Sequence, residues 1–357
     1  MPITLDGTNG ITTPMYNGSI TANAVTPSVN MKNRIINGGM DIAQRGTSFT
    51  SGANNNDAYV LDRFYILSDG NDAIDVTQTT TVPTGAKFSI GLDVETTNKK
   101  FGIAQIIENA NCFDAIGGAV TLSFQAKVSA TTKLDNVKCA IVAWSGTADS
   151  VTSDIISAWG AEGTNPTLIA NATYENTPAN LNVTTSFATY SVTANVDTAS
   201  TSNIIVFIWS DVTDTTAGDF LYITNIQLEK GSTATSFDYR SIGTELQLCQ
   251  RYFQIAGAGA TGKINGTTLI GVGVQYKVPM RINGISCTLT TTTVQIGDAF
   301  IATPTTSSAI ITYLSLSSFS AQGGAYGFEV QIDGFSGLNA SNTTILYTNC
   351  LGLSAEL

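Results

Sequence analysis

The residues of this chain that could do chemistry are its carboxylates, because the sequence contains no histidine. The commonest general base, the commonest zinc ligand and every Ser-His or Cys-His nucleophile pair are therefore excluded. The five cysteines lie far apart in apolar settings and form no C-x-x-C pair, so we predict that they are small buried hydrophobic residues: Cys112, Cys139, Cys249, Cys287 and Cys350.

Paired carboxylates could hydrolyse a glycosidic bond. The run "SDVTDTTAGDF" places Asp211, Asp214 and Asp219 close together, and Glu108 or Glu229 could complete a pair. A chain with 27 acidic residues contains such pairs by chance, however, and nothing in the sequence sets two of them at opposing strand ends. We therefore predict that the protein is not an enzyme.

A second acidic run could hold a metal ion. "DGNDAID" brings together Asp69, Asn71, Asp72 and Asp75, which carry the hard oxygen ligands that calcium prefers. The run lacks the full EF-hand pattern and its terminal glutamate, so a solvated acidic turn is the alternative interpretation. We expect no cofactor, with a structural calcium ion as the one alternative.

Sugar recognition would depend on the aromatic residues, because sugar C–H faces stack on Trp and Tyr while hydroxyls bind Asn, Asp and Gln. Trp144 and Trp209 end apolar segments, which favours core packing. Trp159 lies in "SDIISAWGAEGTNP", among Gly and small residues that indicate a loop. We predict Trp159, with Tyr174 and Tyr190 at loop or strand-edge positions, as ligand-binding residues.

Composition and charge restrict the partners. Hydrophobic residues make up 43% of the 357 residues and charged residues only 12%, with Thr, Ser and Asn in their place, which is typical of β-structure. A net charge of −11 without a large basic cluster makes nucleic acid and anionic membranes poor partners. The N-terminus has no signal-peptide pattern, and no window reaches the roughly 18 apolar residues of a membrane span. We expect a protein that is made in the cytoplasm and neither secreted nor inserted into a membrane.

Strand patterns dominate from residue 33 onward. Apolar and polar residues alternate in "AVTLSFQAKVS", as in a strand with one buried face, whereas "NVKCAIVAW" and "NIIVFIWS" are apolar on both faces, as in central strands. A helix is predicted where Thr244 and Gln247 form a T-x-x-Q capping box. The sequence therefore predicts an all-β protein: an N-terminal attachment arm at 1–32, a β-sandwich at 33–240, a linking helix at 241–253 and a second β-sandwich at 254–357.

Three stretches resemble a class of bacteriophage tail-fibre and tail-tip proteins. They are "NRIINGGMDIAQRGTSFT" with "YVLDRFYI", then "FLYITNIQLEKGSTATSFDYRSIGTELQLCQRYF", and finally "VPMRINGIS" with "LGLSAEL". The resemblance implies that the first domain is a jelly-roll related to carbohydrate-binding modules, with "NGGMDI" as an opening strand and "ITNIQLE" as the closing strand. By the same resemblance, a structural calcium ion would lie where these two strands meet, near Asp41 and Asn225.

The resemblance also implies a function. It indicates a homotrimeric virion appendage that docks to other virion proteins through residues 1–32 and adsorbs to host surface polysaccharide without catalysis. Two alternatives stay open: a purely structural virion protein, such as a head fibre or a baseplate adaptor, and a glycan depolymerase. We interpret the most charged and aromatic passage, 222–253, as a structural joint between the domains, made by Glu229, Phe237, Asp238, Tyr239, Arg240 and Arg251.

Overall fold

The computed structural model describes residues 31–256 and parts of the chain on either side. Beyond residue 256 these parts are 261–265, 269–281, 286–289, 294–298, 305–307, 316–317, 327–332, 343–346 and 351–357. Before residue 31 they are two strands, β1 (Thr4–Asp6) and β2 (Gly10–Thr12), which pair with each other in antiparallel fashion. Most of the predicted attachment arm therefore lies outside the described residues.

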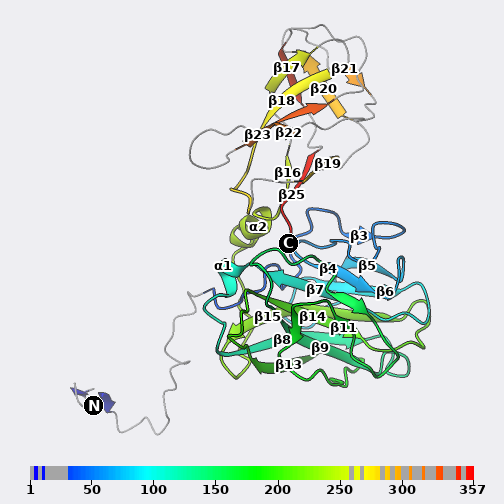
Figure 1. The fold of residues 1–357 in the computed structure, drawn as a ribbon, viewed down its shortest axis with the longest axis vertical. Helices are drawn as coiled ribbons and strands as arrows, with labels where there is room; N and C mark the ends of the chain where they lie inside the picture. Colours follow the sequence, from blue (N-terminus) through cyan, green and yellow to red (C-terminus); the bar gives the residue numbers. More distant parts are fainter. Residues whose placement is uncertain are drawn as a thin grey trace.

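Two antiparallel sheets form a sandwich (Figure 1). The five-stranded sheet has the order β12 (Ala172–Tyr174), β9 (Val137–Trp144), β14 (Asn203–Ser210), β7 (Phe101–Ile107) and β4 (Tyr65–Ser68). The six-stranded sheet has the order β13 (Ala188–Asn195), β8 (Ala119–Val128), β15 (Phe220–Lys230), β6 (Ser89–Val94), β5 (Ile74–Thr79) and β3 (Ser48–Phe49). The connections contain the helix α1 (Asn109–Cys112) and a hairpin of β10 (Ile156–Ala158) and β11 (Thr167–Leu168). The predicted all-β character of this part is confirmed.

The main core lies between the two sheets and follows from strand alternation. On β8, Leu122 and Phe124 are buried in this core, while Gln125 and Lys127 are partly exposed on the outer face. Each such strand contributes alternate side chains to the core because successive side chains of a strand point to opposite faces. The half-buried strand predicted from "AVTLSFQAKVS" is confirmed.

The five-stranded sheet is buried on both faces. Val142, Ile205 and Phe207 point away from the main core into a second hydrophobic cluster. This cluster also contains Ile155 and Trp159, which come from the connection between β9 and β12. A segment at 151–169 therefore covers the outer face of this sheet, which explains why β9 and β14 are buried along their whole length.

A buried ion cluster fastens the covering segment to the sheet. Asp211 follows β14, is fully buried, and pairs with Lys100 and, at 2.6 Å, with Lys138. The Lys100 ammonium also donates hydrogen bonds to the carbonyl oxygens of Ala161 (2.7 Å) and Thr164 (3.0 Å). One lysine thus satisfies a buried carboxylate and holds the loop between β10 and β11.

The predicted opening strand "NGGMDI" is not a strand. The backbone of residues 34–38 runs beside β15 and forms hydrogen bonds of 2.8 and 2.9 Å with it. Asn37 and Met40, however, have φ angles of 61° and 59°, which take the chain out of the extended conformation. The segment "ITNIQLE" does lie in a strand, β15, with a bulge between Thr224 and Gln227.

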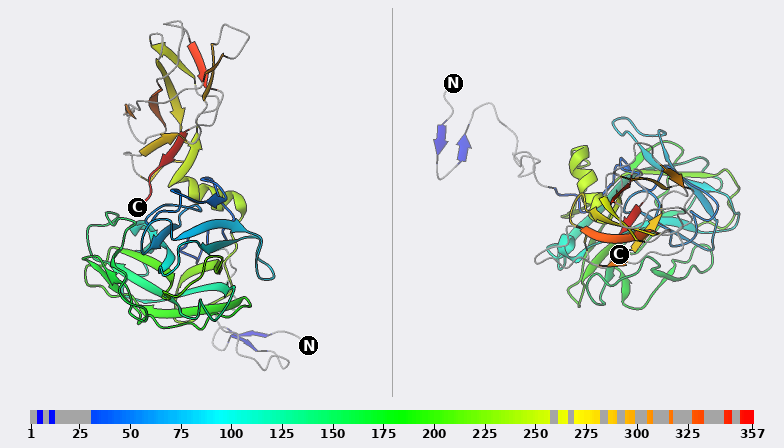
Figure 2. Two further views of the ribbon diagram at one scale, coloured as in Figure 1. Left: turned by 90° about the vertical axis from the view of Figure 1, so that its right-hand side faces the viewer. Right: turned by 90° about the horizontal axis from the view of Figure 1, so that it is seen from above.

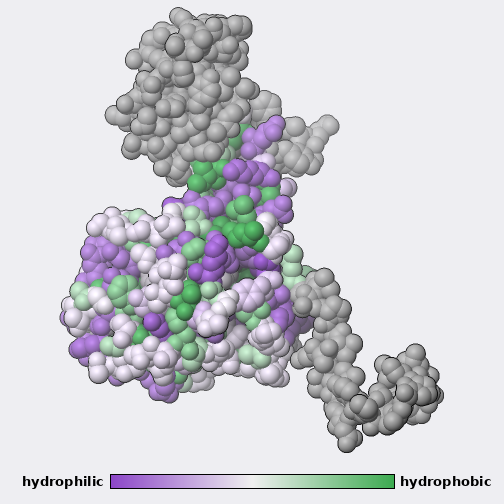
Figure 3. Space-filling model, turned by 180° about the vertical axis from the view of Figure 1, so that it is seen from behind, coloured by the Kyte–Doolittle hydropathy of each residue, from purple (hydrophilic) through white to green (hydrophobic). Residues whose placement is uncertain are grey.

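The linking helix is α2 (Ile242–Gln250), which lies within the predicted range 241–253. Ser241 is its N-cap, because it has the extended backbone that this position requires and its hydroxyl accepts a hydrogen bond from the Thr244 backbone N–H (3.4 Å). Thr244 therefore lies in the first turn, and the prediction that it caps the helix was wrong. Figure 3 shows hydrophobic residues near this helix, where the sandwich meets the C-terminal strands; Ile242 is 59% exposed.

Residues of the predicted joint fasten the loop 231–240 to the start of the sandwich. Glu229 accepts hydrogen bonds from the backbone N–H and the hydroxyl of Thr235, at 2.8 and 2.7 Å. Asp238 accepts from the backbone N–H groups of Lys32 (3.0 Å) and Asn33 (3.3 Å). The loop is therefore held at its middle, at Thr235, and near its end, at Asp238.

Arg251 fixes the end of α2. Its guanidinium donates two hydrogen bonds, of 2.7 and 3.1 Å, to the carboxylate of Glu108, which also accepts one from the Tyr252 hydroxyl (2.8 Å). Burial alone would raise the pKa of Glu108, but the hydrogen bonds from Arg251 and Tyr252 and the charge of Arg251 outweigh it and lower the pKa. The end of the helix is thereby attached to Glu108, which directly follows β7 of the five-stranded sheet.

After α2 the chain forms two further antiparallel sheets, which stand beyond the sandwich (Figure 2). One has the order β16 (Phe253–Ala256), β25 (Leu351–Ser354) and β19 (Ser286–Leu289). The other has the order β21 (Thr305–Ser307), β20 (Val294–Asp298), β24 (Thr343–Leu346), β17 (Thr261–Asn265), β18 (Leu269–Gln275), β23 (Gly327–Ile332) and β22 (Leu316–Ser317).

The chain returns to the sandwich after β25. Glu356 pairs with the buried Arg63 and, at 3.1 Å, with Arg45. The Tyr59 hydroxyl donates a hydrogen bond of 2.5 Å to the carbonyl oxygen of Leu357. The C-terminal strands are therefore connected to the sandwich at two places, through α2 and through residues 354–357.

Two further features bear on the sequence predictions, namely the cysteines and the helices that could span a membrane. Cys112, Cys139 and Cys249 are buried and free, as predicted, while the side chains of Cys287 and Cys350 lie outside the described residues. Within the described part of the chain, no helix has the length and apolar character that crossing a membrane requires.

Replacing Asp211 by asparagine should destabilise the sandwich strongly, because the change leaves the buried ammonium groups of Lys100 and Lys138 without a carboxylate. Removing one partner of a buried ion pair costs about 3–5 kcal/mol. Asp214→Asn is the matched control, since Asp214 and Lys133 form an exposed pair at 3.1 Å that is worth about 0–1 kcal/mol. Urea unfolding measures both, and equal free energies of unfolding would contradict the role of the buried cluster.

Replacing Arg251 by methionine should lower stability mainly near neutral pH. In the native protein the lowered pKa of Glu108 contributes stability above the ordinary glutamate pKa, and this contribution is lost as pH falls through the lowered value. We expect a loss of about 1–2 kcal/mol at pH 7, because Arg251 is partly solvated. The difference from the native protein should shrink below about pH 4.3.

Urea unfolding at a series of pH values from 7 to 3 tests this expectation. Lys133→Met is the control, because it removes only an exposed ion pair. A loss in the Arg251 variant that is constant over the whole pH range would show that the ion pair with Glu108 is not its cause.

Candidate functional site

The aromatic residues predicted to bind a ligand lie in packed surroundings. Trp159 is 9% exposed and meets Phe207 edge to face, with ring centroids 6.0 Å apart. Tyr174 stacks on Trp209, with centroids 6.5 Å apart. Tyr190 is half-buried and packs against the main core from the other sheet. The structure therefore does not bring the three residues together on one surface.

The acidic run predicted to bind calcium is brought together in part. Carboxylate oxygens of Asp72, Asp75 and Glu95 lie within 4.8 Å of one another, and Asp69 is not among them. The buried side chain of Asn54 donates hydrogen bonds to Asp72 (2.9 Å) and Asp75 (3.0 Å). A hydrogen bond with Asp75, and then the charges of Asp75 and Asp72, raise the pKa of Glu95. The amide of Asn54 is thus available to offset part of the repulsion between Asp72 and Asp75, and calcium binding stays a prediction.

Asp41 and Asn225 are the second pair of residues predicted to bind calcium. Their side chains have different neighbours, and Tyr239 lies near both. The amide nitrogen of Asn225 donates hydrogen bonds to the side-chain oxygen of Gln125 (2.7 Å) and to the Tyr239 hydroxyl (3.3 Å). Asp41 lines a cavity whose wall includes the ring of Tyr239. This cavity lies at the predicted joint.

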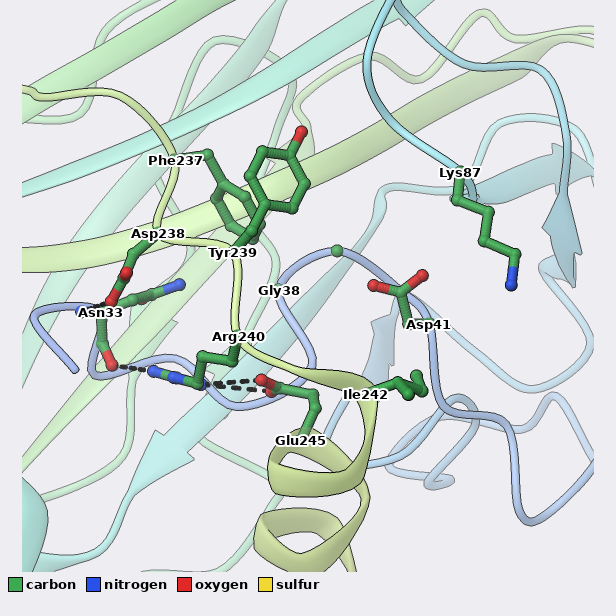
Figure 4. A pocket seen from close by; sticks show the side chains of 11 residues that line it. Asn33, Gly38, Asp41, Lys87, Phe237, Asp238, Tyr239, Arg240, Ile242 and Glu245 are labelled. Atoms are coloured by element: carbon green, nitrogen blue, oxygen red, sulfur yellow. Dashed lines mark hydrogen bonds and ion pairs between the residues drawn. The ribbon is translucent and has the colours of Figure 1, made fainter. Parts of the chain in front are cut away.

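The cavity has a volume of about 190 Å³ and combines an aromatic wall with polar groups (Figure 4). Phe237 and Tyr239 form the wall, with ring centroids 4.7 Å apart and an angle of 81° between the rings. Tyr239 is 59% exposed, so part of its ring faces solvent. Asp41 reaches the cavity from the start of the sandwich, and Lys87 reaches it from the connection between β5 and β6.

Two glycines make room for the aromatic wall. A Cβ at Gly38 would lie 2.0 Å from the carbonyl oxygen of Ile226 and 3.3 Å from the ring of Phe237. A Cβ at Gly39 would lie 3.7 Å from the same ring. The pair "NGG" therefore allows the backbone to approach β15 closely and the ring of Phe237 to lie against it.

The ion pair between Arg240 and Glu245 fixes the segments on one side of the cavity. Arg240 donates hydrogen bonds to the carbonyl oxygens of Asn33 and Ile35 (3.0 Å) and pairs with Glu245 of α2 at 3.1 Å. Glu245 also accepts a hydrogen bond from the backbone N–H of Asn37. The start of the sandwich, the loop 231–240 and α2 are thereby fixed around one space.

The remaining charged groups of the cavity are available to a ligand. Burial raises the pKa of Asp41, while the charge of Lys87 lowers it and the charge of Glu245 raises it. Within the described residues, neither Asp41 nor Lys87 has a partner at ion-pair distance. One carboxylate and one ammonium therefore face a space that is walled by two rings, which suits a ligand with both hydroxyl groups and an apolar face.

The sequence does not predict this arrangement. Phe237 and Tyr239 are predicted as parts of a structural joint, and no role is predicted for Lys87, which lies in a loop without a motif. The signal that was present is the "NGG" pair, because adjacent glycines before a strand-like segment indicate a close approach of the backbone.

No known protein family and no curated protein matches the sequence. The enzymatically active domain of tailspike protein 4 of bacteriophage CBA120 is 18% identical, with a TM-score of 0.33, over 56% of this chain and 22% of that one. Family 16 carbohydrate-binding module 2 is 17% identical, with a TM-score of 0.28, over 43% and 84%. The xylan-binding domain CBM22-1 from Paenibacillus barcinonensis is 13% identical, with a TM-score of 0.28, over 47% and 87%. The chain has a distant structural similarity to carbohydrate-binding modules and to a tailspike domain, without a sequence family, and spans less than a quarter of that tailspike chain.

Proposed function

We propose that this chain is a non-catalytic, sugar-binding appendage of a bacteriophage virion that adsorbs to the polysaccharide of a host cell surface. The cavity at Asp41, Lys87, Phe237 and Tyr239 carries the sugar-binding part of the proposal. Aromatic rings accept the C–H face of a sugar, while a carboxylate accepts and an ammonium donates hydrogen bonds with its hydroxyl groups. The cavity offers all three within one small space.

Three of the five carboxylates considered for hydrolysis are occupied by partners within the fold. Asp211 is buried between two lysines, and Glu108 is held by Arg251 and Tyr252. Glu229 accepts hydrogen bonds from the loop that follows it. These acids hold the structure together, so they are not free to act as the acid and the nucleophile of a glycosidase.

The virion role rests on the resemblance of the three sequence stretches to tail-fibre proteins. In this proposal residues 1–32 dock to other virion proteins, the jelly-roll at 33–240 binds the sugar, and residues 254–357 form a second β-sandwich at the tip. A homotrimer would present three equivalent sites, and multivalency would raise avidity well above the affinity of one site. The proposal also includes a structural calcium ion, either at Asp72 and Asp75 or near Asp41 and Asn225.

Replacing Asp41 by alanine should weaken polysaccharide binding about 10- to 100-fold, because a hydrogen bond to a charged group contributes about 1.5–3 kcal/mol. The measurement uses the full chain on an array of lipopolysaccharide O-chains and capsular polysaccharides, followed by titration of each polymer that the array retains. Asp214→Ala is the control, since Asp214 is an exposed carboxylate on a different loop.

Other outcomes would select the alternatives. Binding to virion proteins without binding to any polysaccharide would favour a purely structural appendage. New reducing ends after incubation with host polysaccharide would favour a depolymerase.

A further inference from the structure

We propose that the cavity is one end of a longer binding track, and that the partly exposed region around Phe220 and Tyr222 on the outer face of the six-stranded sheet carries a platform for an uncharged polysaccharide chain. The platform consists of Phe187, Lys127, Tyr222, Phe220 and Asp93. This inference rests on the proposed function, which it extends from one sugar to a chain of sugars. The outer face of the other sheet is closed by the segment 151–169, whereas these five residues are all partly exposed.

Strand register places the platform residues side by side. Leu221 of β15 points into the core, so Phe220 and Tyr222 point to the outer face. Tyr222 lies opposite Lys127 of β8, and Phe220 lies opposite Asp93 of β6. Two adjacent rings therefore have an ammonium on one side and a carboxylate on the other.

The aromatic groups of the platform are ordered. The rings of Phe220 and Tyr222 are nearly parallel, at 6°, with centroids 5.3 Å apart. The Lys127 ammonium lies 5.2 Å from the centroid of Tyr222 and 5.5 Å from that of Phe187. A Cβ at Gly91 would lie 3.4 Å from the ring of Tyr222, so the ring leans over this glycine.

The polar groups of the platform are not used elsewhere in the described structure. Among the described residues, Lys127 has no carboxylate at ion-pair distance, and its ammonium lies over the two rings. One carboxylate oxygen of Asp93 is buried and has no hydrogen-bond partner within the same part of the chain. The ammonium of Lys127 therefore remains as a donor for the hydroxyl groups of a sugar that lies on the rings.

The charges around the platform determine which class of polysaccharide it can bind. Asp93 lies opposite Asp75 on β5, and burial, Asp75 and Asp219 together raise the pKa of Asp93. Three carboxylates thus surround one end of the platform, against the single ammonium of Lys127, in a chain with a net charge of −11. Such a surface repels a polymer that carries carboxylates or sulfates and accepts an uncharged one.

The platform continues toward the cavity. Gln125 lies two residues from Lys127 on the same face of β8, a step of about 6.6 Å along the strand. The side chain of Asn225 connects Gln125 with the hydroxyl of Tyr239, whose ring is part of the cavity wall. A chain of a few sugar units can therefore contact the rings of the platform and the cavity at the same time.

The test uses a polysaccharide that the array retains, both intact and cut by partial acid hydrolysis into graded fragments. Tyr222→Ala and Lys127→Met should weaken binding of the intact polymer about tenfold, because truncating an interface anchor typically costs more than 1 kcal/mol. Fragments of one or two sugars, which fill only the cavity, should bind both variants as they bind the native protein. Tyr222→Phe keeps the ring and should bind normally, as should Ser191→Ala, which changes an exposed residue elsewhere on the sheet.

The outcomes separate this inference from the proposed function. Native affinity of Tyr222→Ala for the intact polymer, together with weakened binding by Asp41→Ala, would overturn the platform and leave the cavity in place. Retention of acidic polymers alone would overturn the assignment to uncharged chains. Retention of no polysaccharide at all would overturn the proposed function and the platform together. Urea unfolding of Tyr222→Ala serves to confirm that the variant is folded at the binding temperature.

Discussion

The ion pair between Arg240 and Glu245 is the interaction on which the arrangement of the candidate site depends. Arg240 connects the loop 231–240 to the carbonyl groups of the opening segment, and Glu245 connects the same segment to α2. The cavity walls come from these three segments and, at Lys87, from the connection between β5 and β6. Because the pair is mostly buried, separating the segments would leave a guanidinium and a carboxylate without partners, which is costly in a low-dielectric environment. The cavity is therefore a consequence of how the joint is fastened.

Local patterns of the sequence predicted the strands and the two layers well, because strand alternation depends only on neighbouring residues. The alternation in β8 and the apolar character of β9 and β14 both correspond to the observed burial. The sequence did not indicate which segment covers the outer faces of β9 and β14. Trp159 does follow a short strand and lies in a loop, but the loop is folded back onto the sheet by the distant Lys100. Its glycine-rich surroundings gave no sign of that contact.

The ion-pair partners of the arginines likewise could not be predicted from neighbouring residues in the sequence. Asp62 and Asp238 are the acidic residues nearest to Arg63 and Arg240 along the chain. The structure pairs Arg63 with Glu356, 293 residues away, while Asp62 accepts hydrogen bonds from Gln44. Proximity along the chain therefore identified residues that take part in fastening the fold but not the pairs that they form. The same is true of Phe237 and Tyr239, which lie at the joint and also form the wall of the cavity.

Two connections between the sandwich and the C-terminal strands determine how the proposed binding surfaces could work in an assembly. The outgoing connection is fixed by Arg251 and Glu108, and the returning one by Glu356 with Arg45 and Arg63. A single linker would allow the two parts to rotate freely, whereas two anchored crossings restrict that rotation. Multivalent binding raises avidity most when the sites are held at a spacing that matches the ligand, because the effective concentration of each further site is then highest. In the proposed trimer, the ion pairs at these two connections, rather than the proposed sugar-binding residues themselves, would thus determine how much avidity is gained over one site.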